Sequence, residues 1–309
     1  MIDSTVTENY ERWLTRAGEC SHAELAALAD DEKQLLDAFY RDLAFGTGGL
    51  RGVLGVGPNR MNVYTVAKAT QGLADCLNAR FVSPSVAIAR DSRINGDLFM
   101  RIAAEVLAAN GVRACLYPRI EPTPALSFAV RDLGCSAGIC LTASHNPSEY
   151  NGYKVYGSDG CQITTQAAKD IQAAIDAIDI FDGVKRTDYY GALAQGTVEW
   201  IEEDTLDRYI DAVLDQLLEA PLDGPADAGD TSLSVVYTPL NGSGLECFER
   251  MARRIEVSDL RVVPEQVVPD GRFPTCPYPN PEIRKALEKG LELAGRVCPR
   301  RRSGGNRGA

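Results

Sequence analysis

Hydrophobic positions along the chain alternate between two patterns. Short apolar runs at 86–89, 112–117 and 137–141 predict buried strands. Between them, apolar residues recur every three or four positions over 96–110 and about 125–133, and this spacing predicts helices. Strands that alternate with helices of this length are typical of βαβ units. The sequence therefore predicts the α/β class, with mixed, mostly parallel sheets and flanking helices.

Further helices follow from the same periodicity. Asn62 stands before one of them as an expected N-cap, because its side-chain oxygen can accept a hydrogen bond from a free N–H of the first turn. The expected segments in this first part of the chain are 31–43, 62–80, 165–179 and 204–219.

A segment rich in Pro, Gly and Asp at 220–230 is the best linker candidate. We therefore expect a first domain over 1–219 and a second, incomplete domain over 231–294. In the second domain we expect strands at 233–237 and 261–263, a candidate third strand near Val267, and helices at 242–254 and 281–294.

The last fifteen residues, 295–309, differ in composition from the rest, since they hold five Arg and no acidic residue. A basic tail rich in Gly and Arg is typical of a disordered segment. A frameshift is the alternative, because Arg300–Asn306 can be back-translated so that a one-nucleotide shift reads Ala-Ala-Asp-Leu-Val-Ala-Thr. Both interpretations of this aberrant tail stay open.

The charge balance and the cysteines narrow the class of protein. A net charge of −11 argues against a general nucleic-acid binder. No apolar run approaches the length of a membrane span, and the N-terminus shows no secretory signal. The chain has nine Cys, an odd number, and no CxxC pair, so neither a disulfide framework nor a four-cysteine zinc site is expected. We expect reduced thiols in a cytoplasmic protein without membrane or nucleic-acid partners.

The most informative string is LTASHNPSEYNGYKVYG at 141–157, directly after a predicted buried strand. Open α/β sheets bind ligands at the carboxyl ends of their strands, so this is a suitable place for a site. Asn146 and Pro147 would stiffen the turn that presents the neighbouring side chains.

Three side chains in this string could carry chemistry. Ser144 supplies a hydroxyl nucleophile, His145 an imidazole, and Lys154 an ammonium that a short hairpin could return to the same loop. Together they suit phosphoryl transfer, where positioning and charge neutralisation matter most. The alternative from the residues alone is an ordinary Ser/Asn/Pro turn with a solvated histidine and a solvated lysine.

Thr-Ala-Ser-His-Asn-Pro, continuing into Asn-Gly-Tyr-Lys-Val-Tyr-Gly, closely resembles the phosphoserine loop of the α-D-phosphohexomutases, the phosphoglucomutase and phosphomannomutase enzymes. The resemblance runs from about residue 40 to 294 and is strongest toward the phosphoglucomutase/phosphopentomutase branch. Other segments that resemble the family are 45–52, 89–93, 121–124, 237–244 and 273–281.

The resemblance implies an isomerase that interconverts glucose 1-phosphate and glucose 6-phosphate. Ser144 would carry a phosphoryl group, donate it to a sugar monophosphate and recover the other one from glucose 1,6-bisphosphate. His145 and Lys154 match positions beside the phosphoserine that can assist proton transfer. Arg51 would offset phosphate charge, and Asn146 would contact the substrate phosphate. The alternative for Arg51, from its place in a Gly-rich loop, is a solvated cation.

The family also implies Mg²⁺, held by the Ser144 phosphate and by three aspartates of an Asp-x-Asp-x-Asp loop. The acidic clusters at 30–31, 176–179 and 223–230 do not have that pattern. We therefore expect this chain to lack the aspartate ligands and to be inactive alone. The alternatives are a non-catalytic, truncated or frameshifted fragment, or a mutase acting on phosphopentose or mannose phosphate.

Overall fold

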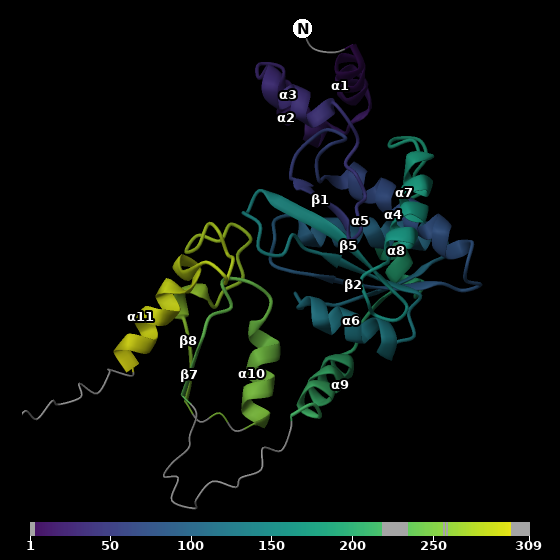
Figure 1. Cartoon of the computed structure of the whole chain (residues 1–309). Helices are drawn as coiled ribbons and strands as arrows, with labels where there is room; N and C mark the ends of the chain where they lie inside the picture. The colour runs from purple at the N-terminus through teal and green to yellow at the C-terminus, as the bar shows by residue number, and fades with distance from the viewer. Residues whose placement is uncertain (1–3, 218–233, 256, 258, 298–309) are drawn as a thin grey trace, which may run out of the picture.

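The computed structural model describes residues 4–217, 234–255, 257 and 259–297. Figure 1 shows a larger first unit built on a central sheet and a smaller second unit beside it. The expected linker at 220–230 and most of the expected tail, 298–309, lie outside the described residues.

A sheet of six strands forms the centre of the first unit. Four strands run parallel to one another, and the other two, β1 and β5, add antiparallel pairings at one side. The expectation of a mixed, mostly parallel α/β sheet is confirmed. Across the sheet the strands are β1 (Gly49–Val53), β5 (Tyr150–Gly157), β4 (Ala137–Leu141), β2 (Ser85–Arg90), β3 (Arg113–Leu116) and β6 (Val198–Trp200).

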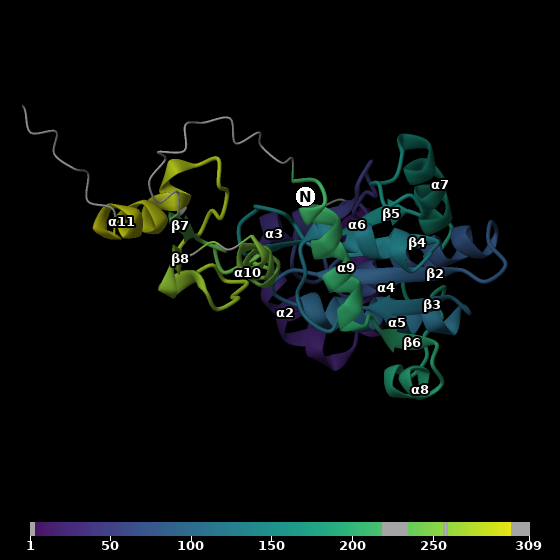
Figure 2. The same ribbon diagram turned by 90° about the horizontal axis from the view of Figure 1, so that it is seen from below.

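Helices cover both faces of this sheet (Figure 1, Figure 2). The larger apolar core joins one face to α4 (Val63–Asn78), α5 (Gly96–Ala109), α7 (Thr165–Asp176) and α8 (Tyr189–Ala194). A second core joins the other face to α6 (Thr123–Asp132) and α9 (Glu203–Leu214). The prediction that Asn62 caps a helix is confirmed, because its side chain accepts hydrogen bonds from Tyr64 N and Thr65 N. The helix predicted at 204–219 ends earlier, at Leu214.

Three N-terminal helices pack together above the sheet in Figure 1. They are α1 (Ser4–Arg16), α2 (His22–Leu28), which follows the short 3-10 turn Glu19–Ser21, and α3 (Glu32–Phe39). Trp13, Leu25 and Phe39 form the centre of their common core. The predicted helix at 31–43 is shorter than expected, because Leu43 N turns away to bond Pro58 O.

The second unit has a parallel pair of strands, β7 (Ser234–Tyr237) and β8 (Asp259–Val262). Helix α10 (Leu245–Arg254) lies between this pair and the first unit in both views (Figure 1, Figure 2). The described part of this unit ends in the 3-10 turn Arg284–Leu287 and α11 (Glu288–Val297).

Two expectations for the second unit are wrong. A strand near Val267 does not form, because this residue has helical backbone angles directly after the 3-10 turn Pro264–Gln266. The helix predicted at 281–294 begins only at Glu288. Ile283 is extended, and the 3-10 turn after it separates the helix from Pro281, which has no N–H to donate.

Candidate active site

Ser144 lies three residues beyond the carboxyl end of β4, in a turn exposed to solvent. Its φ of +57° is in the left-handed region, which a residue with a side chain adopts only when the surroundings hold it there. Its hydroxyl oxygen is 3.3 Å from His145 Nδ1, a distance at which the two groups can share a proton. The turn therefore presents a hydroxyl and an imidazole side by side.

A hydrogen-bonded chain beneath the turn fixes the Ser144 backbone. The Ser144 N–H donates to Thr142 Oγ1 at 2.9 Å, and that hydroxyl donates to Asp91 Oδ2 at 2.5 Å. Asp91 follows β2, the strand next to β4, and 17% of its side chain is exposed. Burial raises the pKa of Asp91, against smaller lowering effects of Thr142, Arg93 and Lys154.

Arg51 and Asn146 contact each other at the edge of this turn. Arg51 lies on β1, where it pairs with Gly152 of β5, and its Nη1 donates to Asn146 Oδ1 at 3.1 Å. The side chain of Arg51 is exposed, as a group that is to meet an anionic ligand must be. The sheet thus brings together two residues that are 95 positions apart in sequence.

Lys154 lies on β5, opposite Cys140 of β4. The hairpin that the sequence suggested is present, since β4 and β5 are antiparallel neighbours joined by the Ser144 turn. Lys154 is half-buried, and its charge acts on Asp91 beneath the turn. Ser144, His145 and Asn146 therefore lie in the turn and Arg51 lies on the strand beside it. Lys154 lies within β5, opposite the next-to-last residue of β4.

A cavity of about 410 Å³ opens above the turn, between the two units. The first unit contributes Ser144, His145 and Asp91, and the second contributes Pro239, Phe273 and Asn280. Its floor includes Glu121, which is 2% exposed and accepts a hydrogen bond from Cys247 Sγ of α10 at 3.6 Å. Burial raises the pKa of Glu121 to about 7.

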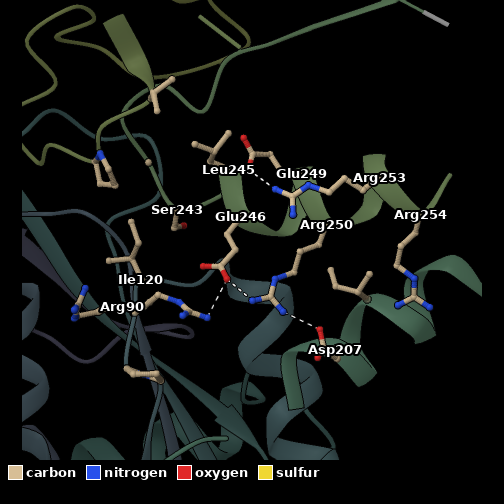
Figure 3. Close-up of a pocket in the computed structure, with 16 residues that line it drawn as sticks. Arg90, Ile120, Asp207, Ser243, Leu245, Glu246, Glu249, Arg250, Arg253 and Arg254 are labelled. Atoms are coloured by element: carbon tan, nitrogen blue, oxygen red, sulfur yellow. Dashed lines mark hydrogen bonds and ion pairs between the residues drawn. The ribbon is translucent and has the colours of Figure 1, made fainter. Parts of the chain in front are cut away.

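A larger cavity of about 940 Å³ lies beside the first and is lined by arginines (Figure 3). Each of these guanidinium groups already has a carboxylate partner. Arg250 of α10, for example, contacts Glu246 at 2.5 Å and Asp207 of α9 at 2.8 Å. Three of these pairs, Arg119–Glu246, Arg250–Asp207 and Arg254–Asp211, join the two units, and we therefore place the candidate site in the smaller cavity. The arginines are Arg90, Arg119, Arg250, Arg253 and Arg254.

The sequence missed three contributors to the site, namely Asp91, Arg93 and Thr142. For Asp91 and Arg93 the signal was the Ala-Arg-Asp-Ser-Arg turn at the carboxyl end of a predicted strand, where Asp91 resembles an ordinary local ion pair, and Thr142 stands in the string at 141–157. In the part of the chain that the structure describes, no group of three or more His, Cys, Asp or Glu could hold a metal ion. Likewise, none of the described helices is both long and apolar enough to cross a membrane.

Two family models match the chain. One describes the α/β/α domain I of phosphoglucomutase/phosphomannomutase and covers residues 42–180, and the other describes domain II and covers 207–298. The chain therefore belongs to the phosphoglucomutase/phosphomannomutase family.

Named relatives agree with this assignment. Phosphoglucomutase from Staphylococcus saprophyticus is 33% identical over 285 residues, which are 92% of this chain and 50% of that protein. Phosphoglucomutase from Staphylococcus aureus strain N315 is 33% identical over 296 residues, 94% of this chain and 50% of that protein. The chain thus spans about half the length of the curated relatives it matches.

Solved structures show the same fold. A protein from Thermus thermophilus that is assigned as a phosphomannomutase superposes with a TM-score of 0.67 at 26% identity, over 82% of this chain and 52% of that one. A phosphoglucomutase/phosphomannomutase family protein from Burkholderia thailandensis gives a TM-score of 0.59 at 22% identity, over 79% of this chain and 48% of that one.

Proposed function

We propose that this chain carries the phosphoserine site of a phosphohexomutase that interconverts glucose 1-phosphate and glucose 6-phosphate. The observation that carries the proposal is Ser144, whose exposed hydroxyl lines a cavity at the carboxyl end of β4, 3.3 Å from His145 Nδ1. The family membership of the chain supports the reaction class.

In the proposed reaction, Ser144 begins as a phosphoserine. A free hydroxyl of the hexose monophosphate attacks phosphorus, a new sugar O–P bond forms, and the bond from phosphorus to Ser144 Oγ breaks. The sugar hydroxyl loses its proton to the imidazole of His145, and Ser144 Oγ regains one from His145 or from the ammonium of Lys154. The bisphosphate then turns over and returns its other phosphoryl group to Ser144 by the same steps.

Arg51 and Asn146 would bind the phosphate oxygens in this scheme. A guanidinium offers two parallel donors to a phosphate, and the contact between Arg51 Nη1 and Asn146 Oδ1 already orients the side chain toward the Ser144 turn. Lys154 would add a second positive charge beneath the same turn.

Mg²⁺ belongs to the proposal as the cation that the Ser144 phosphate would attract. When bound, it would neutralise charge on the transferring group. The described residues supply no further cluster of ligands and do not by themselves fit a metal site, so no step is assigned to the ion.

A second candidate function is the binding of a phosphosugar without turnover. In this alternative Arg51, Asn146 and Lys154 would hold the phosphate, and the described residues offer no cluster of three or more His, Cys, Asp or Glu for a metal ion. The proposal includes inactivity of this chain alone and a cytoplasmic location, and its alternative substrate is a phosphopentose or a mannose phosphate.

Two measurements separate these candidates. Incubation with glucose 1,6-bisphosphate should place one phosphoryl group on Ser144, as read by intact mass and peptide mapping, and the matched Ser144→Ala variant should gain none. A coupled assay with glucose 6-phosphate dehydrogenase should show turnover on the order of a thousandfold below that of a complete mutase, because several kcal/mol of charge stabilisation are missing. Rapid Mg²⁺-dependent turnover would contradict the expected inactivity.

A further inference from the structure

A buried arginine supports the Ser144 turn from below. The side chain of Arg93 is 0% exposed, and its guanidinium donates to four backbone carbonyls of the turn. Nη1 bonds Pro147 O at 2.9 Å and Tyr150 O at 2.8 Å, and Nη2 bonds Ser144 O at 3.1 Å and Asn146 O at 2.5 Å. One side chain thus ties both ends of the loop that carries Ser144.

Only an arginine can make this set of contacts. The four acceptors are divided between two nitrogens of one planar group, whereas a lysine has three donors on a single atom. The carbonyls need such a partner because the loop leaves the β4–β5 ladder and the left-handed φ of Ser144 prevents regular pairing.

Burying the charged Arg93 guanidinium costs free energy, and this cost argues against an incidental contact. The hydrogen-bond acceptors of the guanidinium are neutral carbonyls, so the buried charge is offset mainly by Asp91, whose Oδ2 lies 3.5 Å from Arg93 Nε. That Nε has no hydrogen-bond partner among the described residues. Burial lowers the pKa of Arg93 accordingly.

The second unit closes over the same side chain. The ring of Phe273 lies over the Arg93 guanidinium at 5.2 Å from its centroid, and Phe273 is 4% exposed. Beside it, a Cβ on Gly271 would lie 2.6 Å from both Ile94 N and Ser92 O, so the two backbones pack directly against each other. The turn at 270–273 therefore presses on the segment that holds Arg93.

We propose that Arg93 is the positioning residue of the Ser144 turn and that Phe273 of the second unit locks it in place. Docking of the second unit thereby fixes the conformation in which Ser144 exchanges its phosphoryl group. The inference rests on the proposed function for the chemistry of Ser144 but not for the conformation of the turn.

Hydrogen exchange on the full chain tests the conformational part. In Arg93→Met, exchange at the amides of 144–150 should rise at least about tenfold while the amides of 137–141 stay protected, because the loop opens locally. Arg93→Lys should behave similarly, since it keeps the positive charge but loses the planar group whose two nitrogens bind the four carbonyls. Arg113→Met, which removes an exposed partner of Glu199 at the far end of β3, is the matched control and should leave 144–150 unchanged.

Phosphorylation by glucose 1,6-bisphosphate tests the link to Ser144. The rate of adduct formation should fall roughly 10- to 100-fold in Arg93→Met, and a smaller fall is expected in Phe273→Leu, which keeps apolar bulk but loses the ring. In Arg93→Gly, added ethylguanidinium should restore part of the rate and ethylammonium should not, a selectivity that a loss of stability alone would not produce.

Each outcome decides one of the two proposals. If the wild-type chain gains no adduct, the proposed function fails, and hydrogen exchange still decides the role of Arg93. If wild type and Arg93→Met gain adduct equally fast, or if exchange at 144–150 does not change, the positioning role is wrong. Should Arg93→Met fail to fold, Arg93→Lys and Phe273→Leu give the same comparison.

Discussion

Glu121 and Cys247 meet across the junction of the two units, where Cys247 Sγ donates to Glu121 Oε2 at 3.6 Å. Both residues are buried, at 2% and 3% exposure. Burial raises the pKa of Glu121 to about 7, the charge of Glu246 acts in the same direction, and Arg119 and Arg250 act in the opposite one. A carboxylic acid whose pKa is close to neutral pH thus lies at the interface that closes the candidate site.

This relationship predicts how stability depends on pH. The folded chain binds the Glu121 proton more tightly than the unfolded chain does, so the contribution of Glu121 is fully present below about pH 4.5 and is lost as pH rises to about 7. The change amounts to an upper limit on the order of 3 kcal/mol. In Glu121→Gln this part of the pH dependence should disappear, and the variant should be the more stable chain at about pH 8. Urea unfolding at about pH 4.5 and at about pH 7 measures the free energy of unfolding of both chains. If this free energy changes with pH equally in wild type and in Glu121→Gln, the prediction is wrong.

Arg250→Met should loosen the second unit. Arg250 joins α10 to α9 through Glu203 and Asp207, and 22% of its side chain is exposed, so the network is worth more than an isolated surface pair. We expect a loss of about 1–2 kcal/mol, seen as faster hydrogen exchange in α10 and as a smaller difference from wild type at high salt.

The matched control for Arg250 is Arg253→Met. Arg253 is 74% exposed and forms an ion pair with Glu249 of the same helix. Its loss should change stability by less than about 0.5 kcal/mol. Equal effects of the two substitutions would mean that Arg250 does not join the units.

Gly152→Ala should disrupt the site from within the sheet. A Cβ on Gly152 would lie 2.5 Å from Thr142 O and 2.9 Å from Leu50 O, and backbone on both sides cannot give way. We expect a loss of about 2–3 kcal/mol together with slower phosphorylation of Ser144, because Thr142 is displaced.

Gly48→Ala is the control for that substitution. A Cβ there would meet the amide end of Gln162, a flexible side chain that can rotate away. Thermal unfolding should show a change below about 1 kcal/mol. A larger loss for Gly48→Ala than for Gly152→Ala would show that the backbone clash has been misjudged.

His145→Gln should slow phosphoryl transfer without altering the fold. The imidazole is exposed and its Nδ1 lies 3.3 Å from Ser144 Oγ, so the ring can move a proton but adds little packing. We expect the rate of adduct formation to fall by about 10²-fold or more, with unchanged thermal unfolding. An unchanged rate would assign proton transfer to Lys154 alone, and His145→Gln combined with Lys154→Met would check this.

The central strands could be predicted because β2 and β4 are buried on both faces and read as uninterrupted apolar runs. β1 was missed because its sequence, GLRGV, contains two glycines and an exposed arginine. β6 was missed because three residues are too few to show a period. The length of α11 was overestimated because the chain before Glu288 follows turn geometry set by neighbouring prolines.

The candidate site, like the fold, contains residues that the sequence could predict and residues that it could not. Ser144 and His145 stand in one contiguous string, so sequence alone could single them out. Arg93 could not be predicted, because its partners are backbone carbonyls, which every residue has. The contact between Glu121 and Cys247 joins residues 126 positions apart, and no periodicity reports such a pair.

The central claim is that Ser144 is the residue that carries the phosphoryl group. The most direct test is peptide mapping of the full chain after incubation with glucose 1,6-bisphosphate, with Ser144→Ala treated in parallel. We predict one phosphoryl group, on the peptide that contains Ser144, and none in the variant. A main adduct on any other residue, or equal phosphorylation of the two chains, would contradict the claim.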